Sequence, residues 1–265
     1  MGATFVKKLM FKWFVELTGN QTSSKILKTF TASKWSRYLN ASFAKVNRIN
    51  TDEMEKPLHE YTSLQALFTR KLKEGVRTVD RSPRTIVSPV DAVVTSFGKV
   101  SHSQSFLVKG QSYKLEEIFG GEKRANVYKN GTYFIFYLSP AHYHRIHSPV
   151  NGTIREQWTL GNSSYPVNNI GLTYGSKPLS TNYRLITTIN HQDSQIAVVK
   201  VGALNVNSIH LTHEQSELKK GEEVAYFSFG STVILFIEKD DFHISANIRK
   251  NMNIQYGTAI GVFQS

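Results

Sequence analysis

The hydrophobic pattern of this 265-residue chain changes at about residue 85. Before that point apolar residues recur at helical spacing, and after it they gather in short β-rich runs separated by Gly, Asn, Pro and Ser. Short apolar runs bounded by turn residues are typical of strands. The clearest runs cover residues 92–97, 133–138, 196–201, 224–229 and 232–237. We therefore predict an α+β fold, with a helical N-terminal region over residues 1–75 and a strand-rich body over residues 76–265.

Residues 1–50 combine helical periodicity with most of the positive charge. They contain nine Lys and Arg and one Glu, which gives +8 of the formal net charge of +12. One helix is predicted where apolar residues recur at every fourth position from Phe5 to Leu17. A second helix is predicted over residues 26–46, and a third, shorter one over residues 61–73.

The charge of this region favours an anionic partner. A basic amphipathic helix that carries Trp and Phe, like the first one, is typical of helices that lie in the interface of an anionic membrane. For the second helix, covering the core of the domain is an equally good interpretation. Nucleic acid is not expected as a partner, because zinc-finger, basic-zipper and RNP-type motifs are absent from the sequence.

Other protein classes are excluded by what the sequence lacks. Neither N-terminal helix has the run of about 18 apolar residues that a membrane span requires, and Lys12 interrupts the first one. A secretory signal is not recognisable either. The chain contains no cysteine, so disulfides, thiolate nucleophiles and cysteine-ligated metals are excluded.

Three segments carry the side chains that could perform chemistry, and each lies next to predicted strands. Residues 88–92 contain Asp91, residues 139–149 contain three histidines, and residues 229–232 contain Ser231. An acid, a histidine and a hydroxyl are the components of an activated serine.

The dipeptide Gly230-Ser231 interrupts a long apolar run. A glycine there permits a strained backbone and leaves its carbonyl open to attack by the hydroxyl of the next residue, which would give an N-to-O acyl shift. A β-bulge or a tight bend in the strand is the structural alternative.

The histidine cluster has its own alternative interpretation. His142, His144 and His147 lie within six residues of one another, so they could ligate a metal ion in a metal-dependent hydrolase. No fourth ligand is designated by the spacing. Titratable side chains that gather on a turn are also where pKa tuning supports acid–base catalysis.

Together with Val201-Gly202-Ala203 and Lys220-Gly221-Glu222-Glu223, these segments resemble the phosphatidylserine decarboxylases over most of the chain. These are pyruvoyl-dependent, self-processing enzymes that make phosphatidylethanolamine. The C-terminal part, with Gly257 and Gly261, also resembles the flattened β-sandwich hybrid of lipoyl-type domains.

The resemblance implies that residues 76–265 form a catalytic domain that cuts itself. His147 would take the proton of the Ser231 hydroxyl while Asp91 orients the imidazole, and Ser231 would attack the carbonyl of Gly230. The chain would break between Gly230 and Ser231 into residues 1–230, the beta chain, and residues 231–265, the alpha chain. The two would remain a non-covalent heterodimer, whose further dimerisation is left open.

By the same resemblance, Ser231 would become a covalent pyruvoyl cofactor, and no metal is expected. The pyruvoyl carbonyl would accept the electrons that decarboxylation releases. His144 would handle protons during that reaction, and His147 could share the work. The substrate would be phosphatidylserine, an anionic lipid, so we expect a peripheral protein on the cytoplasmic side of the cell membrane. A non-catalytic lipid-binding module remains as an alternative.

Overall fold

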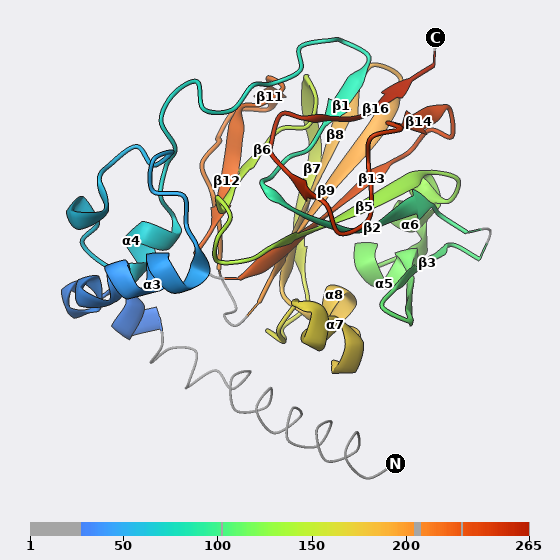
Figure 1. Ribbon diagram of the computed structural model, residues 1–265. Helices are drawn as coiled ribbons and strands as arrows, with labels where there is room; N and C mark the ends of the chain where they lie inside the picture. Colours follow the sequence, from blue (N-terminus) through green and yellow to red (C-terminus); the bar gives the residue numbers. More distant parts are fainter. Residues whose placement is uncertain (1–27, 102, 204–207, 229, 265) are drawn as a thin grey trace.

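In the computed structural model the described residues are 28–101, 103–203, 208–228 and 230–264. The predicted first helix lies outside them. After residue 85 strands predominate over helices, and several short helices precede or interrupt the strands (Figure 1). The α+β class and the strand-rich body are therefore confirmed. The lipoyl-like arrangement and the domain boundary after residue 75 stay predictions.

The body is built on an eight-stranded antiparallel sheet with the order β11-β7-β8-β9-β13-β5-β2-β15. Two three-stranded sheets, β1-β16-β14 and β10-β12-β6, and the hairpin β3-β4 complete the strands of the described residues. The strands are β1 Thr85–Val87, β2 Ala92–Lys99, β3 Ser105–Val108, β4 Gln111–Lys114, β5 Thr132–Leu138, β6 Arg145–His147, β7 Gly152–Leu160, β8 Arg184–His191, β9 Ser194–Gly202, β10 Ile209–Leu211, β11 Glu217–Leu218, β12 Glu223–Phe227, β13 Ser231–Ile237, β14 Phe242–Ile244, β15 Asn253–Ile254 and β16 Ala259–Phe263.

The helices are short. They are η1 Lys34–Leu39, α3 Asn40–Asn47, η2 Leu58–Glu60, α4 Leu64–Phe68, α5 Leu115–Phe119, α6 Glu122–Ala125, η3 Asn126–Tyr128, α7 Asn169–Tyr174 and α8 Pro178–Thr181. In Figure 1, α3 and α4 lie on one side of the strand-rich body and α5 and α6 on the other. Among the described residues, no helix combines the length and the hydropathy that crossing a bilayer requires.

Strand β13 runs through the middle of the large sheet. All seven of its residues are buried, and all seven pair with β5 on one side and with β9 on the other. Its side chains alternate between two apolar clusters: Val233 and Leu235 enter one, and Ile234 and Phe236 enter the other. Burial on both faces explains why β13 is continuously apolar from Val233 to Ile237 rather than alternating.

The predicted second helix is not continuous. Helical residues end at Ala32, the 3₁₀ helix η1 follows, and α3 ends where Arg48 takes a left-handed conformation. The hydroxyl of Ser33 donates to the carbonyl of Phe30, and that of Ser36 donates to the carbonyls of Thr31 and Ser33. Serine side chains that bond to nearby carbonyls compete with regular helix in this way.

The predicted helix over residues 61–73 is likewise shorter, because only α4 is helical. Ser63 caps its start by accepting a hydrogen bond from the amide of Ala66. At its end, the hydroxyl of Thr69 bonds back to the carbonyl of Gln65, and Leu72 forms a β-bridge with Met54. The helix predicted over residues 61–73 is thus confirmed only from Leu64 to Phe68, and tertiary pairing decides the conformation beyond it.

Candidate active site

Ser231 is the first residue of the central strand β13. It pairs with Leu138 of β5 and Gly202 of β9, and its side chain is fully buried. Its Oγ lies 3.5 Å from Nδ1 of His144. This distance is at the outer limit of a hydrogen bond, and such contacts between catalytic groups are often long before substrate binds. The fold thus brings together two predicted site residues that are 87 positions apart.

The imidazole of His144 is held in one tautomer. Its Nε2 lies 2.9 Å from the carbonyl oxygen of Ser139, which can only accept, so Nε2 carries the proton. Nδ1 therefore offers its lone pair to Ser231. The ring is fully buried against Phe68, at 3.9 Å between centroids. Burial lowers the pKa of His144 well below its usual value, and the charge of Arg70 lowers it further.

Two arginines tie helix α4 to the histidine segment. Nη2 of Arg70 donates to the carbonyls of Ala141 and His142 at 2.7 and 2.9 Å. In the opposite direction, Arg145 donates to the carbonyl of Thr69 and forms an ion pair of 2.6 Å with Glu223. We call this pair of contacts the arginine clamp. The clamp could not be predicted from the sequence, because Arg70 lies outside the three segments with candidate site residues and the contacts join residues more than 70 positions apart.

His147 occupies a different environment. Its Nδ1 lies 2.9 Å from the carbonyl oxygen of Gly221, so Nδ1 carries the proton, and its ring stacks on Tyr256 at 3.7 Å. Nε2 is buried and has no hydrogen-bond partner among the described residues. Burial lowers the pKa of His147 to about 4, an effect that the bond to Gly221 opposes and the charge of Arg145 reinforces. His147 is thus a neutral base with a free lone pair.

The carboxylate of Asp91 is bound by Arg77. The guanidinium group reaches both carboxylate oxygens, with a shortest distance of 2.6 Å, and the same group contacts Glu53 at 2.7 Å. The backbone amide of Tyr256 also donates to Asp91, at 2.9 Å. In the described part of the chain, His147 forms no hydrogen bond with Asp91 or Ser231. Tyr256 connects them instead, since its amide binds Asp91 and its ring packs on His147.

A largely apolar cavity of about 490 Å³ opens beside Ser231. Its lining residues come from both parts of the chain: Thr31, Phe43, Leu64, Gln65, Phe68, Tyr137, Leu138, Pro140, Pro166, Val167, Asn168, Ala203, Ser228, Gly230 and Ser231. A Cβ atom built onto Gly230 would meet no heavy atom within 4 Å outside its chain neighbours, so the junction with Ser231 borders open space at Gly230. The cavity can accept an apolar ligand next to the serine.

The three histidines do not converge on one point. His142 accepts from the amide of Ser139 through Nδ1 and contacts Asn253 through Nε2, whereas His144 and His147 bond to the separate carbonyls described above. Within the described ranges, no group of three His, Cys, Asp or Glu side chains has the arrangement of a metal site. The geometry therefore gives no support to the interpretation as a metal-dependent hydrolase.

A buried serine whose hydroxyl faces a neutral histidine, at a Gly-Ser junction beside an apolar cavity, is an arrangement that can support a hydroxyl nucleophile. The family model for phosphatidylserine decarboxylase matches residues 64–262. A protein named phosphatidylserine decarboxylase proenzyme from Halalkalibacterium halodurans is 52% identical over 97% of this chain and 98% of its own length. Proteins of the same name from Anoxybacillus flavithermus and Geobacillus kaustophilus are 51% and 50% identical, over 96% and 97% of this chain and the same shares of their own length.

The chain belongs to the phosphatidylserine decarboxylase family, and it is therefore a decarboxylase, an enzyme of the lyase class. The predicted membership is confirmed, and the interpretation as a non-catalytic module is not supported. The individual roles of Asp91, His144, His147 and Ser231 stay predictions.

The buried histidines make acid sensitivity a property of this fold. The folded-state pKa of His147 is about 4, below the usual value of about 6.5 in an unfolded chain. Between these two pH values His147 is protonated in the unfolded chain but neutral in the folded protein. The free energy of unfolding therefore falls as the pH decreases below about 6.5. We expect a loss of about 2 kcal/mol from His147 between pH 7.5 and pH 5.

Urea unfolding at both pH values measures this loss, and the variant His147→Gln should show a smaller one. The matched control is His59→Gln, which removes an exposed histidine and should leave the pH dependence as it is. An equal pH dependence in wild type and His147→Gln would contradict the assignment.

Proposed function

We propose that this enzyme decarboxylates phosphatidylserine to phosphatidylethanolamine with a pyruvoyl group that it makes from Ser231. The observation that carries the proposal is the contact of 3.5 Å between Ser231 Oγ and His144 Nδ1, at a Gly-Ser junction that borders an apolar cavity. The names of the relatives support the substrate and a precursor form that is cut.

Self-cleavage begins when the Ser231 hydroxyl loses its proton to His147. A bond forms between Oγ and the carbonyl carbon of Gly230, and the amide bond between the two residues breaks, which leaves an ester and a free amine. Loss of the Cα proton of residue 231 then breaks the bond between Cβ and Oγ and releases the carboxylate of Gly230. Hydrolysis of the remaining dehydroalanine yields ammonia and the pyruvoyl group.

The role of His147 is supported by its lone pair, which is buried and has no partner in the described residues. Asp91 contributes through Tyr256, which it holds against the imidazole. Because His147 does not contact Ser231 in this arrangement, its part in cleavage requires the imidazole to approach the sheet-bound Ser231 before the cut. Once the junction is open, His144 is the base that faces residue 231.

The fragments stay together after the cut. Strand β13 begins at Ser231 and belongs to the alpha chain, whereas both of its partners, β5 and β9, belong to the beta chain. Seven residue pairs on each side and burial on both faces hold the small fragment in place. The mature enzyme is thus a non-covalent heterodimer of residues 1–230 and 231–265.

The surroundings of Ser231 fit a pyruvoyl group. Residue 231 is covalently fixed in the sheet, His144 faces its side chain, and the open space at Gly230 admits a substrate amine. When present, the group supplies a carbonyl that withdraws electrons from the bond that loses CO2. The residues of the chain bind the acyl chains in the apolar cavity, exclude water, and hold a proton acceptor at Nδ1 of His144.

The nucleophile can be tested by intact-mass spectrometry. We expect wild type to give two fragments, cut between Gly230 and Ser231, with the small one beginning in a pyruvoyl group. Ser231→Ala removes the only atom that attacks, so it should remain a single chain without decarboxylase activity.

Ser228→Ala is the matched control, because Ser228 lines the same cavity and is equally buried. This variant should be cut like wild type. Normal maturation of Ser231→Ala would rule out Ser231 as the nucleophile.

The two histidines can be separated by substitution. His147→Gln and Asp91→Asn should slow or stop cleavage, which denaturing electrophoresis reports. His144→Gln should still be cut but lose about 100-fold or more in CO2 release from phosphatidylserine micelles, as expected when a proton-transfer group is removed. His243→Gln, an exposed position on β14, should leave both unchanged. Full cleavage of His147→Gln, or full turnover of His144→Gln, would overturn the division of roles.

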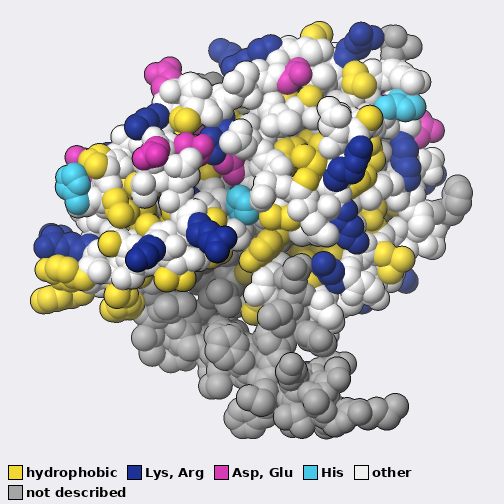
Figure 2. All heavy atoms as spheres, viewed as in Figure 1, with side chains coloured by type: hydrophobic (Ala, Val, Ile, Leu, Met, Phe, Trp, Pro, Cys, Tyr) yellow, Lys and Arg dark blue, Asp and Glu magenta, His cyan; other side chains and the backbone are white. Residues whose placement is uncertain are grey.

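We also propose that the enzyme is a peripheral protein on the cytoplasmic side of the cell membrane. Large apolar side chains are exposed along the N-terminal helices: Phe30, Trp35, Tyr38, Leu39 and Val46. Trp35 is 77% and Val46 79% exposed. Lys and Arg lie among them, and Figure 2 shows yellow and dark-blue side chains side by side at the lower left, where Figure 1 has α3. We call these five apolar residues the apolar patch.

A patch of this kind fits the interface of an anionic bilayer, because aromatic side chains enter the headgroup region while the cations contact the lipid charges. The cavity beside Ser231 is lined by Thr31 and Phe43 of the same segment. The patch and the cavity thus share one segment of the chain, which favours entry of a lipid from the side of the patch.

The double variant Trp35→Ser/Val46→Ser tests the patch in a vesicle flotation assay. Removing two apolar side chains that enter the bilayer should weaken binding to vesicles with phosphatidylserine by about tenfold or more. Leu107→Ser is the control, since Leu107 is 64% exposed on β3, away from the patch. Equal binding of the double variant and wild type would refute this docking surface.

A further inference from the structure

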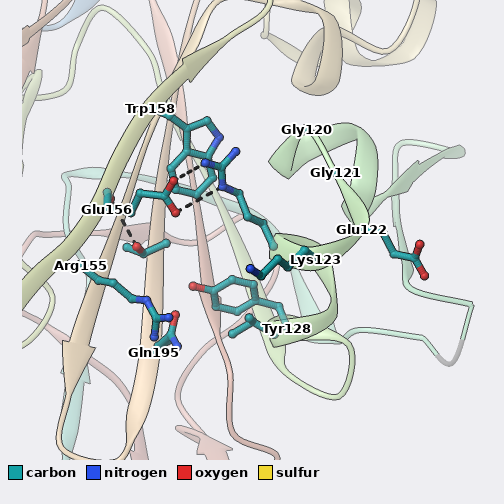
Figure 3. A pocket seen from close by; sticks show the side chains of 12 residues that line it. Gly120, Gly121, Glu122, Lys123, Tyr128, Arg155, Glu156, Trp158 and Gln195 are labelled. Carbon is teal, nitrogen blue, oxygen red and sulfur yellow. Dashed lines mark hydrogen bonds and ion pairs between the residues drawn. The ribbon is translucent and has the colours of Figure 1, made fainter.

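A second cavity of about 490 Å³ lies far from Ser231. It is formed by α6, η3 and the strands β7, β8 and β9, and Figure 3 shows its side chains. Gln195, at the start of β9, lines it, whereas Ser231 pairs with Gly202 at the other end of that strand. At about 3.3 Å per residue, the two sites are about 20 Å apart.

A β-bulge in β7 directs charged side chains into this cavity. The register of β7 against β8 shifts between Ile154 and Glu156, so Arg155 is an extra residue. Ile154 packs on one core cluster and Trp158 on the other, although residues four apart in a regular strand share a face. The bulge thus places Arg155, Glu156 and Trp158 on the same side, and bulges commonly re-aim side chains at functional sites.

The cavity contains more positive than negative charge that is free to bind a ligand. Arg124 is neutralised by its ion pair with Glu156, and its guanidinium group lies 4.2 Å from the ring centroid of Trp158. Lys123 and Arg155 form no ion pair with the described residues. Figure 3 shows Glu122 pointing away from the other side chains.

The hydroxyl of Tyr128 is the second, independent observation. The side chain is 1% exposed, and its oxygen has no hydrogen-bond partner in the described residues. In Figure 3 this oxygen points toward Arg155 and Gln195. Burial, and then the charge of Glu238, raise the pKa of Tyr128, so the hydroxyl keeps its proton and can donate. A buried donor without an acceptor is unfavourable, and an anionic ligand oxygen would satisfy it.

We propose that this cavity is a binding site for a small soluble phosphate ester. Lys123 and Arg155 match the two charges of a phosphate dianion, and the hydroxyl of Tyr128 donates to a phosphate oxygen. The rest of the ester lies against Trp158. The ligand is soluble rather than a lipid headgroup, because the cavity and the apolar patch lie on opposite sides of the molecule in Figure 1, where α6 and α3 mark them.

Isothermal titration calorimetry of the full chain with glycerol 3-phosphate tests the site, with inorganic phosphate as a second probe. We expect saturable binding to one site in wild type. Arg155→Gln should weaken it by about tenfold or more, and Tyr128→Phe by about threefold to tenfold, because each loses one hydrogen bond to a charged group. Lys129→Gln is the control, since it removes an exposed neighbouring charge that does not line the cavity.

Tyr128→Phe is the decisive variant because it alters no charge and removes only the unpaired hydroxyl. Without ligand its melting temperature should equal or exceed that of wild type, and the increase caused by glycerol 3-phosphate should shrink. Absence of saturable binding to wild type would overturn the site. So would unchanged binding in both Arg155→Gln and Tyr128→Phe, or binding only to vesicles with phosphatidylglycerol and not to the soluble ester.

Discussion

The pairing of β13 with β5 and β9 is the constraint on which the rest of the structure depends. Because each of its seven residues is paired in register with both neighbouring strands and the strand is buried on both faces, it cannot slide by one residue without exchanging its two sets of side chains. Ser231 is the first residue of that strand. Its position is therefore fixed by the most buried part of the fold, while Gly230, just before it, borders open space.

Two buried, neutral histidines of the candidate site, His144 and His147, share one arrangement of hydrogen bonds. In each, one ring nitrogen donates to a backbone carbonyl, of Ser139 for His144 and of Gly221 for His147, and the other keeps its lone pair. Burial lowers the pKa of both rings, so neither needs to lose a proton before it can accept one. Their difference is positional, because only His144 contacts Ser231 in this arrangement.

The sequence allowed five of the strands to be located, β2, β5, β9, β12 and β13, but not the contacts among the candidate site residues. The β5 and β13 runs were located almost to the residue, since burial on both faces leaves a continuous apolar signal. The second helix was predicted as one piece, because apolar spacing does not reveal serine side chains that compete for backbone carbonyls. The ion pair between Arg77 and Asp91 was also missed, since it joins residues that no motif connects.

The arginine clamp and Phe68 connect the helical region directly to the segment that carries His144. The positive charge of the helical region alone would not suggest this connection. Arg70 donates to the carbonyls of Ala141 and His142, just before His144. Arg145 donates to the carbonyl of Thr69, which follows the last residue of α4. Phe68 of α4 packs on the His144 ring. Any displacement of α4 therefore moves His144 relative to Ser231, which is anchored separately in the sheet. The same N-terminal segment carries the apolar patch, so the membrane docking proposed above would act on the helices that contact the His144 segment. The membrane would then help to shape the site as well as supply its substrate.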